Sequence, residues 1–208
     1  MKKLIFCVIC AAILLTGCKG EDTAVKVDGS NITLDNAGIV IAMPDGWEIL
    51  SGDALYEQMA SHSAITADEL REAYDEAGMC HYARGASTDS KVMAVISSQN
   101  MAPEADGDER VTLADYARSV HDSTIFEYFA SDYKTGGDSS FAEASYGDKN
   151  GYLSYFEVFT ADEASEFIVG FSEYFFEQDQ LIYSVQVCYF DEAYKDEAMS
   201  VIENIAAI

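Results

Sequence analysis

The chain has 208 residues and contains 37 Asp and Glu residues against 12 Lys and Arg residues, so its formal net charge is −25. This excess argues against binding to nucleic acid or to an anionic lipid surface, because no basic cluster is available to neutralise phosphate groups. Hydrophobic residues make up 49% of the chain and include 13 tyrosines and 11 phenylalanines, which excludes a disordered acidic protein.

The first 18 residues have the layout of a secretory signal that ends at a cysteine. Two lysines precede an apolar run over residues 4–15, which ends in Leu15-Thr16-Gly17-Cys18. As a helix this run is about 18 Å long, too short for a hydrocarbon core of about 30 Å. The four residues resemble the lipobox of bacterial lipoproteins. The resemblance implies a signal peptide over residues 1–17 and a diacylglyceryl group on Cys18, which anchors the protein to the outer face of the cell membrane.

The remaining cysteines leave one question open. Cys7 and Cys10 are lost with the signal and Cys18 receives the lipid, so only Cys80 and Cys188 stay free in the mature chain. Outside the cytoplasm these two can form a disulfide. Both also lie in predicted strands, where a buried free thiol is equally ordinary.

A short polar tether and a first strand occupy residues 18–30, and residues 31–208 form the predicted globular domain. Met43-Pro44-Asp45-Gly46-Trp47 marks a turn between two early strands. Two helices follow: Ser51 caps the first, and Thr66 forms a capping box with Glu69 at the start of the second. The predicted strands of this half cover residues 24–27, 32–34, 38–42, 48–50, 79–84 and 91–98.

Thr112 caps a third helix, after which the chain becomes rich in strands. Asn150-Gly151 predicts the turn of one hairpin, and residues 178–180 predict the turn of a second. Alternation places Phe167, Val169 and Phe171 on one face of their strand. The predicted strands cover residues 141–146, 152–160, 167–177 and 181–190, and a final helix covers residues 192–207.

This order of elements predicts an α+β fold with a single domain. Consecutive hairpins indicate a largely antiparallel β-sheet, and amphipathic helices must cover its faces. The aromatic residues of the late strands are expected in the core between these layers. The predicted architecture is therefore an α/β/α sandwich.

Three features resemble the PsbP-like group (PsbP/Mog type), which includes many bacterial lipoproteins. They are the Met43–Trp47 turn, the helix that opens Thr112-Leu113-Ala114-Asp115-Tyr116-Ala117, and the late aromatic strands closed by a helix. The resemblance covers residues 31–208. It implies an antiparallel sheet between helical layers, and a role in binding or assembly rather than catalysis. Trp47 is expected to pack on the sheet behind its turn.

The sequence contains no arrangement of residues that specifies a reaction. His62, His81 and His121 lack the spacing of metal ligands, and no Gly-x-Ser-x-Gly motif is present. The densest acidic loop does not fit the spacing of an EF-hand, so we expect at most weak calcium binding and no other cofactor. Its acidic residues are Glu104, Asp106, Asp108 and Glu109.

These observations predict a non-catalytic, membrane-anchored module that binds an envelope protein or a small ligand. Two alternatives remain open. One is a carboxylate-dependent envelope hydrolase, since the many acidic residues can contain a catalytic pair that the sequence does not reveal. The other is a structural or calcium-associated envelope protein.

Overall fold

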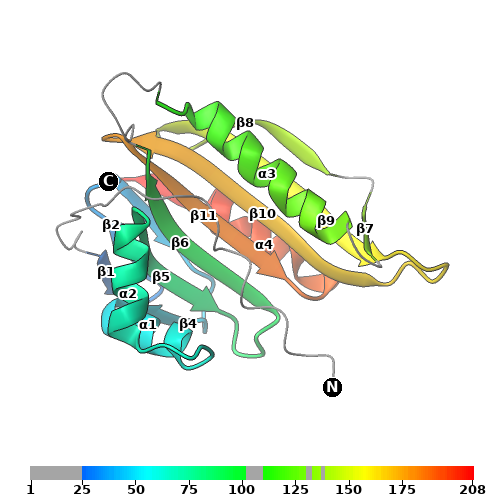
Figure 1. Ribbon diagram of the computed structural model, residues 1–208, viewed down its shortest axis with the longest axis horizontal. Coiled ribbons are helices and arrows are strands. Elements are labelled where there is room, and N and C mark those ends of the chain that lie inside the picture. The colour runs from blue at the N-terminus through cyan, green and yellow to red at the C-terminus, as the bar shows by residue number, and fades with distance from the viewer. Residues whose placement is uncertain (1–24, 102–109, 130–132, 137–138) are drawn as a thin grey trace.

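The computed structural model describes residues 25–101, 110–129, 133–136 and 139–208, which form two antiparallel sheets and four α-helices (Figure 1). The lipidation site predicted at Cys18 and the acidic loop from Glu104 to Glu109 lie outside these residues. No helix within them is both long enough and apolar enough to cross a membrane. The predicted class, a single α+β domain with a largely antiparallel sheet flanked by helices, is confirmed.

The larger sheet has eight strands in the order β4-β5-β6-β11-β10-β9-β7, and β8 pairs with the same edge of β9 as β7 does. Long consecutive hairpins build its centre, where β9, β10 and β11 lie side by side. Its strands are β4 (Glu48–Ser51), β5 (Met79–Ala86), β6 (Val92–Asn100), β7 (Tyr133–Thr135), β8 (Ser140–Tyr146), β9 (Lys149–Thr160), β10 (Phe167–Gln178) and β11 (Leu181–Tyr189).

A second sheet of four strands was not predicted. It has the order β1-β2-β3-β12 and joins the start of the described chain to its end. The final helix was predicted to run to residue 207, but α4 (Lys195–Glu203) stops early and Ile205 pairs with Ile41 instead. Ile205 continues the apolar spacing of the helix and is buried in the strand as well, so the pattern did not distinguish the two. The four strands are β1 (Val25–Asp28), β2 (Asn31–Leu34), β3 (Ile39–Ala42) and β12 (Ile205–Ala207).

The two faces of the large sheet are covered differently. One, here the inner face, packs against α4 and the small sheet, and the main core lies there. The other, here the outer face, carries α1 (Gly52–Ala60) and α2 (Ala67–Glu76) at one side and α3 (Leu113–Phe129) at the other (Figure 1). A short 3-10 helix, η1 (Glu192–Tyr194), precedes α4. The largest fully buried core side chains include Tyr174, Tyr183, Tyr189, Phe175 and Phe176, which confirms the predicted aromatic core.

The helix caps follow the sequence with one exception. Thr66 Oγ1 accepts from the Glu69 backbone N–H at 3.2 Å, and the Thr66 N–H donates to the Glu69 carboxylate at 2.8 Å, which completes the capping box. Thr112 Oγ1 accepts from the Asp115 N–H at 3.1 Å. Ser51 precedes α1 but its side chain makes no capping hydrogen bond, so that prediction is wrong.

The first late hairpin turns three residues earlier than predicted. Its turn is Gly147-Asp148, with Gly147 at a φ of +60°. Gly151 lies inside β9, where a Cβ atom would come within 1.9 Å of the Phe175 carbonyl oxygen. The glycine therefore serves the close approach of β10 rather than the turn. The second hairpin turns at Asp179 and Gln180, within the predicted segment.

Phe167 lies on the opposite face from Val169 and Phe171, contrary to the predicted alternation. A register shift between Phe167 and Val169 interrupts the pairing of β10 with β9. Val169 and Phe171 pack together on the outer face, whereas the Phe167 ring stacks on Tyr189 on the inner face. A β-bulge reverses the facing of every residue before it, which a period of two does not foresee.

Candidate functional site

A row of aligned residues crosses the outer face of the large sheet, and several of its members are polar. The strand registers place its members opposite one another on successive strands. We call it the cross-sheet row. From β4 to β8 it consists of Leu50, Arg84, Val95, Gln186, Glu173, Ser154 and Phe141.

Helices cover the two ends of the cross-sheet row but leave its middle open. On this face α1 and α2 contact β4 and β5, while α3 contacts β7, β9 and β10 (Figure 1). The helix in main contact with β6 and β11 is α4, which lies on the inner face. Val95, Gln186 and Glu173 are accordingly half-buried, and Ser97 with Ser184 forms a second polar pair beside them at 3.0 Å. The middle of the row is thus a polar strip of sheet between two helical covers.

Glu173 is the carboxylic acid of this strip. Gln186 Nε2 donates to its Oε2 at 3.3 Å, and Ser184 is a second hydrogen-bond partner. Burial raises the pKa of Glu173 to about 7, although the two hydrogen bonds act in the opposite direction. Near neutral pH the group is therefore divided between an acid that donates and a carboxylate that accepts.

Arg84 supplies the cation at the other end of the strip. Its guanidinium donates to the Gln58 side chain of α1 and to Met93 Sδ at 2.9 Å. Three strand spacings of about 4.8 Å separate the backbones of Arg84 and Glu173, so the two groups lie on the order of 14 Å apart. A positive group and a titrating acid thus bracket a floor of hydroxyl and amide groups.

His121 and Ser154 form the hydrogen bond that a nucleophile and its base would make, but they are closed off. His121 Nδ1 lies 2.7 Å from Ser154 Oγ, and the two residues are 6% and 3% exposed. The rings of Phe141 and Phe156 lie against the imidazole, at centroid distances of 5.4 and 6.2 Å. Burial lowers the pKa of His121. Among the described residues no carboxylate bonds its other nitrogen, so the pair fits a structural contact between α3 and β9 better than a catalytic dyad.

A second polar cluster lies on the inner face around Glu157. Its carboxylate Oε1 accepts from Tyr155 Oη at 2.5 Å, from Tyr189 Oη at 2.7 Å and from Lys195 Nζ at 3.1 Å. Burial acts to raise the pKa of Glu157, but these three donors outweigh it and hold the pKa below its ordinary value. A carboxylate with three donors on one oxygen is well satisfied, which indicates an anchor for α4 rather than a binding site.

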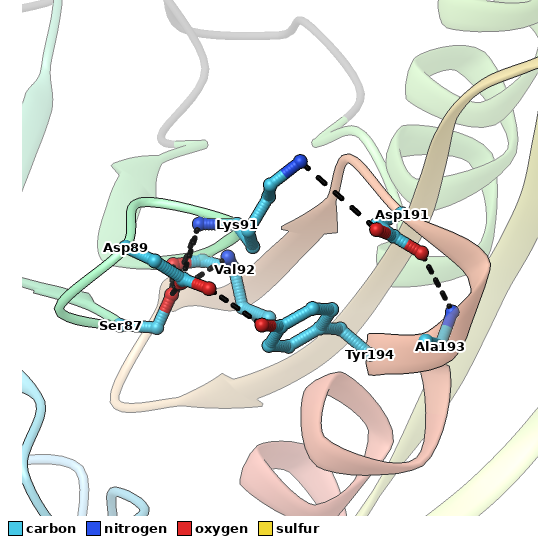
Figure 2. A network of polar contacts seen from close by, with 7 residues as sticks. All are labelled: Ser87, Asp89, Lys91, Val92, Asp191, Ala193 and Tyr194. Carbon is cyan, nitrogen blue, oxygen red and sulfur yellow. Dashed lines mark hydrogen bonds and ion pairs between the residues drawn. The ribbon is translucent and has the colours of Figure 1, made fainter.

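Further polar contacts fix the start of α4. Tyr194 Oη donates to Asp89 Oδ2 at 2.5 Å in the turn between β5 and β6, and Lys91 lies 4.0 Å from Asp191 (Figure 2). In the same turn Ser87 Oγ accepts from the Val92 N–H at 3.0 Å, while Asp191 accepts from the Ala193 N–H at 3.1 Å (Figure 2). The contacts of Tyr194 and Asp191 thus hold the turn between β5 and β6 to the segment around η1 that leads into α4.

Trp47 packs behind its turn, as predicted from the sequence. A Cβ atom at Gly85 would lie 3.0 Å from the Trp47 ring, so the indole rests directly on β5. The ring nitrogen donates to Glu197 Oε1 of α4 at 2.7 Å. Trp47 therefore joins the turn after β3 to the same helix that Tyr194 and Lys195 fasten.

The structure keeps Cys80 and Cys188 apart, between which the sequence left a disulfide open. Neither cysteine forms a disulfide. Cys80 lies opposite Ser98 on β6 and packs at the inner core, whereas Cys188 lies opposite Met93 and packs at the outer face. Five residues along a strand correspond to about 16 Å, well beyond the reach of a disulfide. The disulfide that the sequence left open is therefore not formed.

The three histidines lie in different elements. His62 is exposed after α1, His81 lies in β5 beneath α2, and His121 lies in α3. Groups of three or more metal-ligating side chains are absent from the described residues. Sequence reasoning did not identify the cross-sheet row, although one signal was present. Glu173 interrupts an aromatic strand, and Ser184 and Gln186 alternate with valines in the next one.

Comparison with known proteins finds similarity in fold only. No protein-family model and no curated protein matches the sequence. The solution structure of cyanobacterial PsbP from Synechocystis sp. PCC 6803 matches with a TM-score of 0.49 and 8% identity, over 82% of this chain and 87% of that chain. The crystal structure of Mycobacterium tuberculosis LpqN, a protein involved in cell envelope biogenesis, matches with a TM-score of 0.42 and 12% identity, over 81% and 82%. A PsbP-type chain is thus among the structures that resemble this fold, as the sequence resemblance predicted.

Proposed function

We propose that this protein is a non-catalytic binding module, anchored through a lipid on Cys18 to the outer face of the cell membrane. The open middle of the cross-sheet row, at Val95, Gln186 and Glu173, is its binding surface for an envelope protein or a small polar ligand. The observation that carries this proposal is the uncovered polar strip between α1–α2 and α3. A sheet face beside helices is normally apolar, and this one instead presents Glu173 and Gln186 half-buried, with the buried hydroxyl group of Ser184 beside them.

The chemistry of the strip favours binding over catalysis. Arg84 offers a planar cation suited to carboxylate or phosphate groups. Glu173 offers a donor or an acceptor according to its protonation. A carboxylate-dependent hydrolase needs a second acid close to the first. Among the described residues, the influences on the pKa of Glu173 are burial, Ser184 and Gln186, and no second carboxylate is among them.

Crosslinking in the native membrane tests the binding surface. A photo-crosslinking amino acid replaces Val95 at the middle of the row, and a matched chain carries it at Glu163 in an exposed loop. We expect a discrete adduct from position 95 that weakens when Glu173→Gln and Arg84→Gln are added. Equal adducts from both positions, or none from position 95, would contradict the proposal.

The anchor and the hydrolase alternative have separate tests. Cys18→Ala is expected to leave an unprocessed precursor that lacks the mass of the lipid. An unchanged mass and unchanged membrane partitioning would exclude the anchor.

To test the hydrolase alternative, turnover of a panel of ester and glycoside substrates is compared between the wild type and Glu173→Gln. Turnover that disappears with Glu173→Gln would favour the hydrolase over the binding module.

A further inference from the structure

The free edge of β8 is the second surface of interest, and it does not depend on the cross-sheet row. β8 spans seven residues, and among the residues that the structure describes it pairs with β9 alone, along one side. It forms the outermost strand at that end of the sheet in Figure 1. A strand edge presents unpaired backbone N–H and C=O groups, which are a template for another strand.

The hairpin register identifies which backbone groups face outward. Tyr146 and Lys149 flank the two-residue turn, so they form a hydrogen-bonded pair, and such pairs recur at every second residue. The residues between them point their N–H and C=O groups away from β9. These residues are Phe141, Glu143 and Ser145, and none of them has a backbone partner within the described parts of the chain.

Apart from the single charge of Glu143, this edge lacks the features that usually protect an edge strand. It contains no proline, lysine or arginine, and Ser140, Ala142, Glu143 and Ser145 are exposed. The edge strand of the small sheet, β1, is shorter and carries Lys26, which pairs with Asp35 at 2.6 Å. At the opposite end of the large sheet, β4 has only four residues before α1 begins. The β8 edge is therefore the longest and least protected among these edge strands.

An open hollow lies beside this edge. It has a volume of about 510 Å³ and extends from the first turn of α3, at Thr112 and Leu113, to Glu143, Ser145 and Tyr152 of the β8–β9 hairpin. Glu143 and Ser145 lie on the same face of β8 as Phe141. This face is directed toward α3, because the Phe141 ring contacts the guanidinium group of Arg118 in that helix. A side chain placed opposite Glu143 by an added strand would thus enter at the rim of this hollow.

We propose that β8 docks an extended, basic segment of a partner protein, which adds to the sheet as a further antiparallel strand. The backbone groups of Phe141, Glu143 and Ser145 supply the hydrogen bonds, and Glu143 pairs with a lysine or arginine directly opposite. The net charge of −25 attracts such a segment over longer range. A second copy fits poorly, because the register that pairs all three outward residues places Glu143 opposite its own copy.

The test uses the full chain and three capped nine-residue peptides. In the first peptide lysine alternates with valine, in the second proline replaces the valines, and in the third glutamate replaces the lysines. Backbone amide exchange of the protein is followed by NMR. We expect the lysine–valine peptide to slow the exchange of the Phe141, Glu143 and Ser145 amides about tenfold and the other two peptides to leave it unchanged.

Two substitutions at one position separate charge from backbone pairing. Glu143→Gln keeps the N–H and should weaken binding severalfold, whereas Glu143→Pro removes an outward donor and should abolish it. Glu163→Gln, an equal loss of charge in an exposed loop, is the control and should bind as the wild type does. The peptide series remains decisive even where the proline variant fails to fold.

Three results would overturn the proposal. Equal binding of the proline peptide would show attraction by charge alone. Exchange that slows elsewhere, for example at Gln186 and Glu173, would place the peptide on the cross-sheet row. Exchange at β8 that slows with protein concentration in the absence of peptide would identify a second copy as the occupant.

Discussion

The ring of Tyr189 occupies the space above Gly170, so that its hydroxyl group reaches Glu157 on the strand beyond. Gly170 lies opposite Tyr189 on one side and opposite Glu157 on the other. A Cβ atom at position 170 would come within 2.0 Å of the Tyr189 ring. The glycine is therefore required by the close approach of a side chain and not by a turn.

We expect Gly170→Ala to lower the free energy of unfolding by about 3 kcal/mol or more, because the buried Tyr189 ring has no free space to move into. Urea denaturation of the purified protein measures this loss. In a Tyr189→Leu background the same substitution should cost clearly less, since the obstructing ring is gone. Equal costs in the two backgrounds would show that the ring is not the obstacle.

Removal of either of the two charges of the Glu157 cluster is expected to lower the free energy of unfolding, but by very different amounts. Glu157→Leu removes the carboxylate that accepts from Tyr155, Tyr189 and Lys195, and leaves the two hydroxyls only each other, 3.0 Å apart, so it should lower the free energy of unfolding by about 2 to 3 kcal/mol. Lys195→Met removes a donor whose side chain is 40% exposed, so it should cost less than about 1 kcal/mol. Urea denaturation of both variants checks the order. A larger loss for Lys195→Met would mean that α4 is held by the ammonium and not by the carboxylate.

The sequence predicted the elements of this fold better than their ends. The capping box of Thr66 with Glu69 was found because it depends on residues three apart, and such local chemistry is visible in a sequence. The turn at Gly147-Asp148 was missed because Gly151 supplied a stronger local signal. Gly151 is needed for contact with Phe175 on a distant part of the chain, and a local pattern contains no information on that contact.

The cross-sheet row was beyond sequence reasoning for a related reason. Arg84, Gln186 and Glu173 come from three strands, and their alignment depends on the register of each strand with the next. One bulge in β5, between His81 and Ala83, sets where Arg84 falls. Registers result from packing across the whole sheet, so polar residues in separate strands could be noted but not brought together.

His81 predicts a loss of stability in acid. Its ring is buried beneath Tyr74 of α2, and neither ring nitrogen has a hydrogen-bond partner among the described residues. Burial lowers its pKa from 6.5 to about 4. The unfolded chain therefore binds more protons than the folded protein between these values. The contribution of His81 to the free energy of unfolding is therefore complete above about pH 6.5. It falls by about 1.4 kcal/mol per pH unit as the pH decreases toward 4.

His81→Leu isolates this effect, because all other titratable groups are common to the variant and the wild type. We expect the variant to unfold at a urea concentration that depends less on pH between 4 and 6.5 than that of the wild type. At pH 7 it should be as stable or more stable, since two buried nitrogens without partners are removed. Parallel pH profiles for the two proteins would show that the pKa of His81 is the same in the folded protein and in the unfolded chain, which would contradict the prediction.

The burial of Glu173 predicts a pH dependence of stability that is opposite in sign to that of His81. Burial raises its pKa from 4.5 to about 7, so the folded protein binds more protons than the unfolded chain between these values. Its stabilising contribution is complete below about pH 4.5 and is lost as the pH rises through 7. Glu173→Gln resembles the protonated acid and removes the titration. We expect the free energy of unfolding of the variant to match that of the wild type near pH 4 and to exceed it by about 1 to 3 kcal/mol at pH 8.

Urea denaturation at these two pH values measures the difference, with Glu163→Gln as the exposed control. An equal gain at both values would point to a change of packing, and a gain confined to pH 4 would mean that Glu173 is stabilised as the carboxylate.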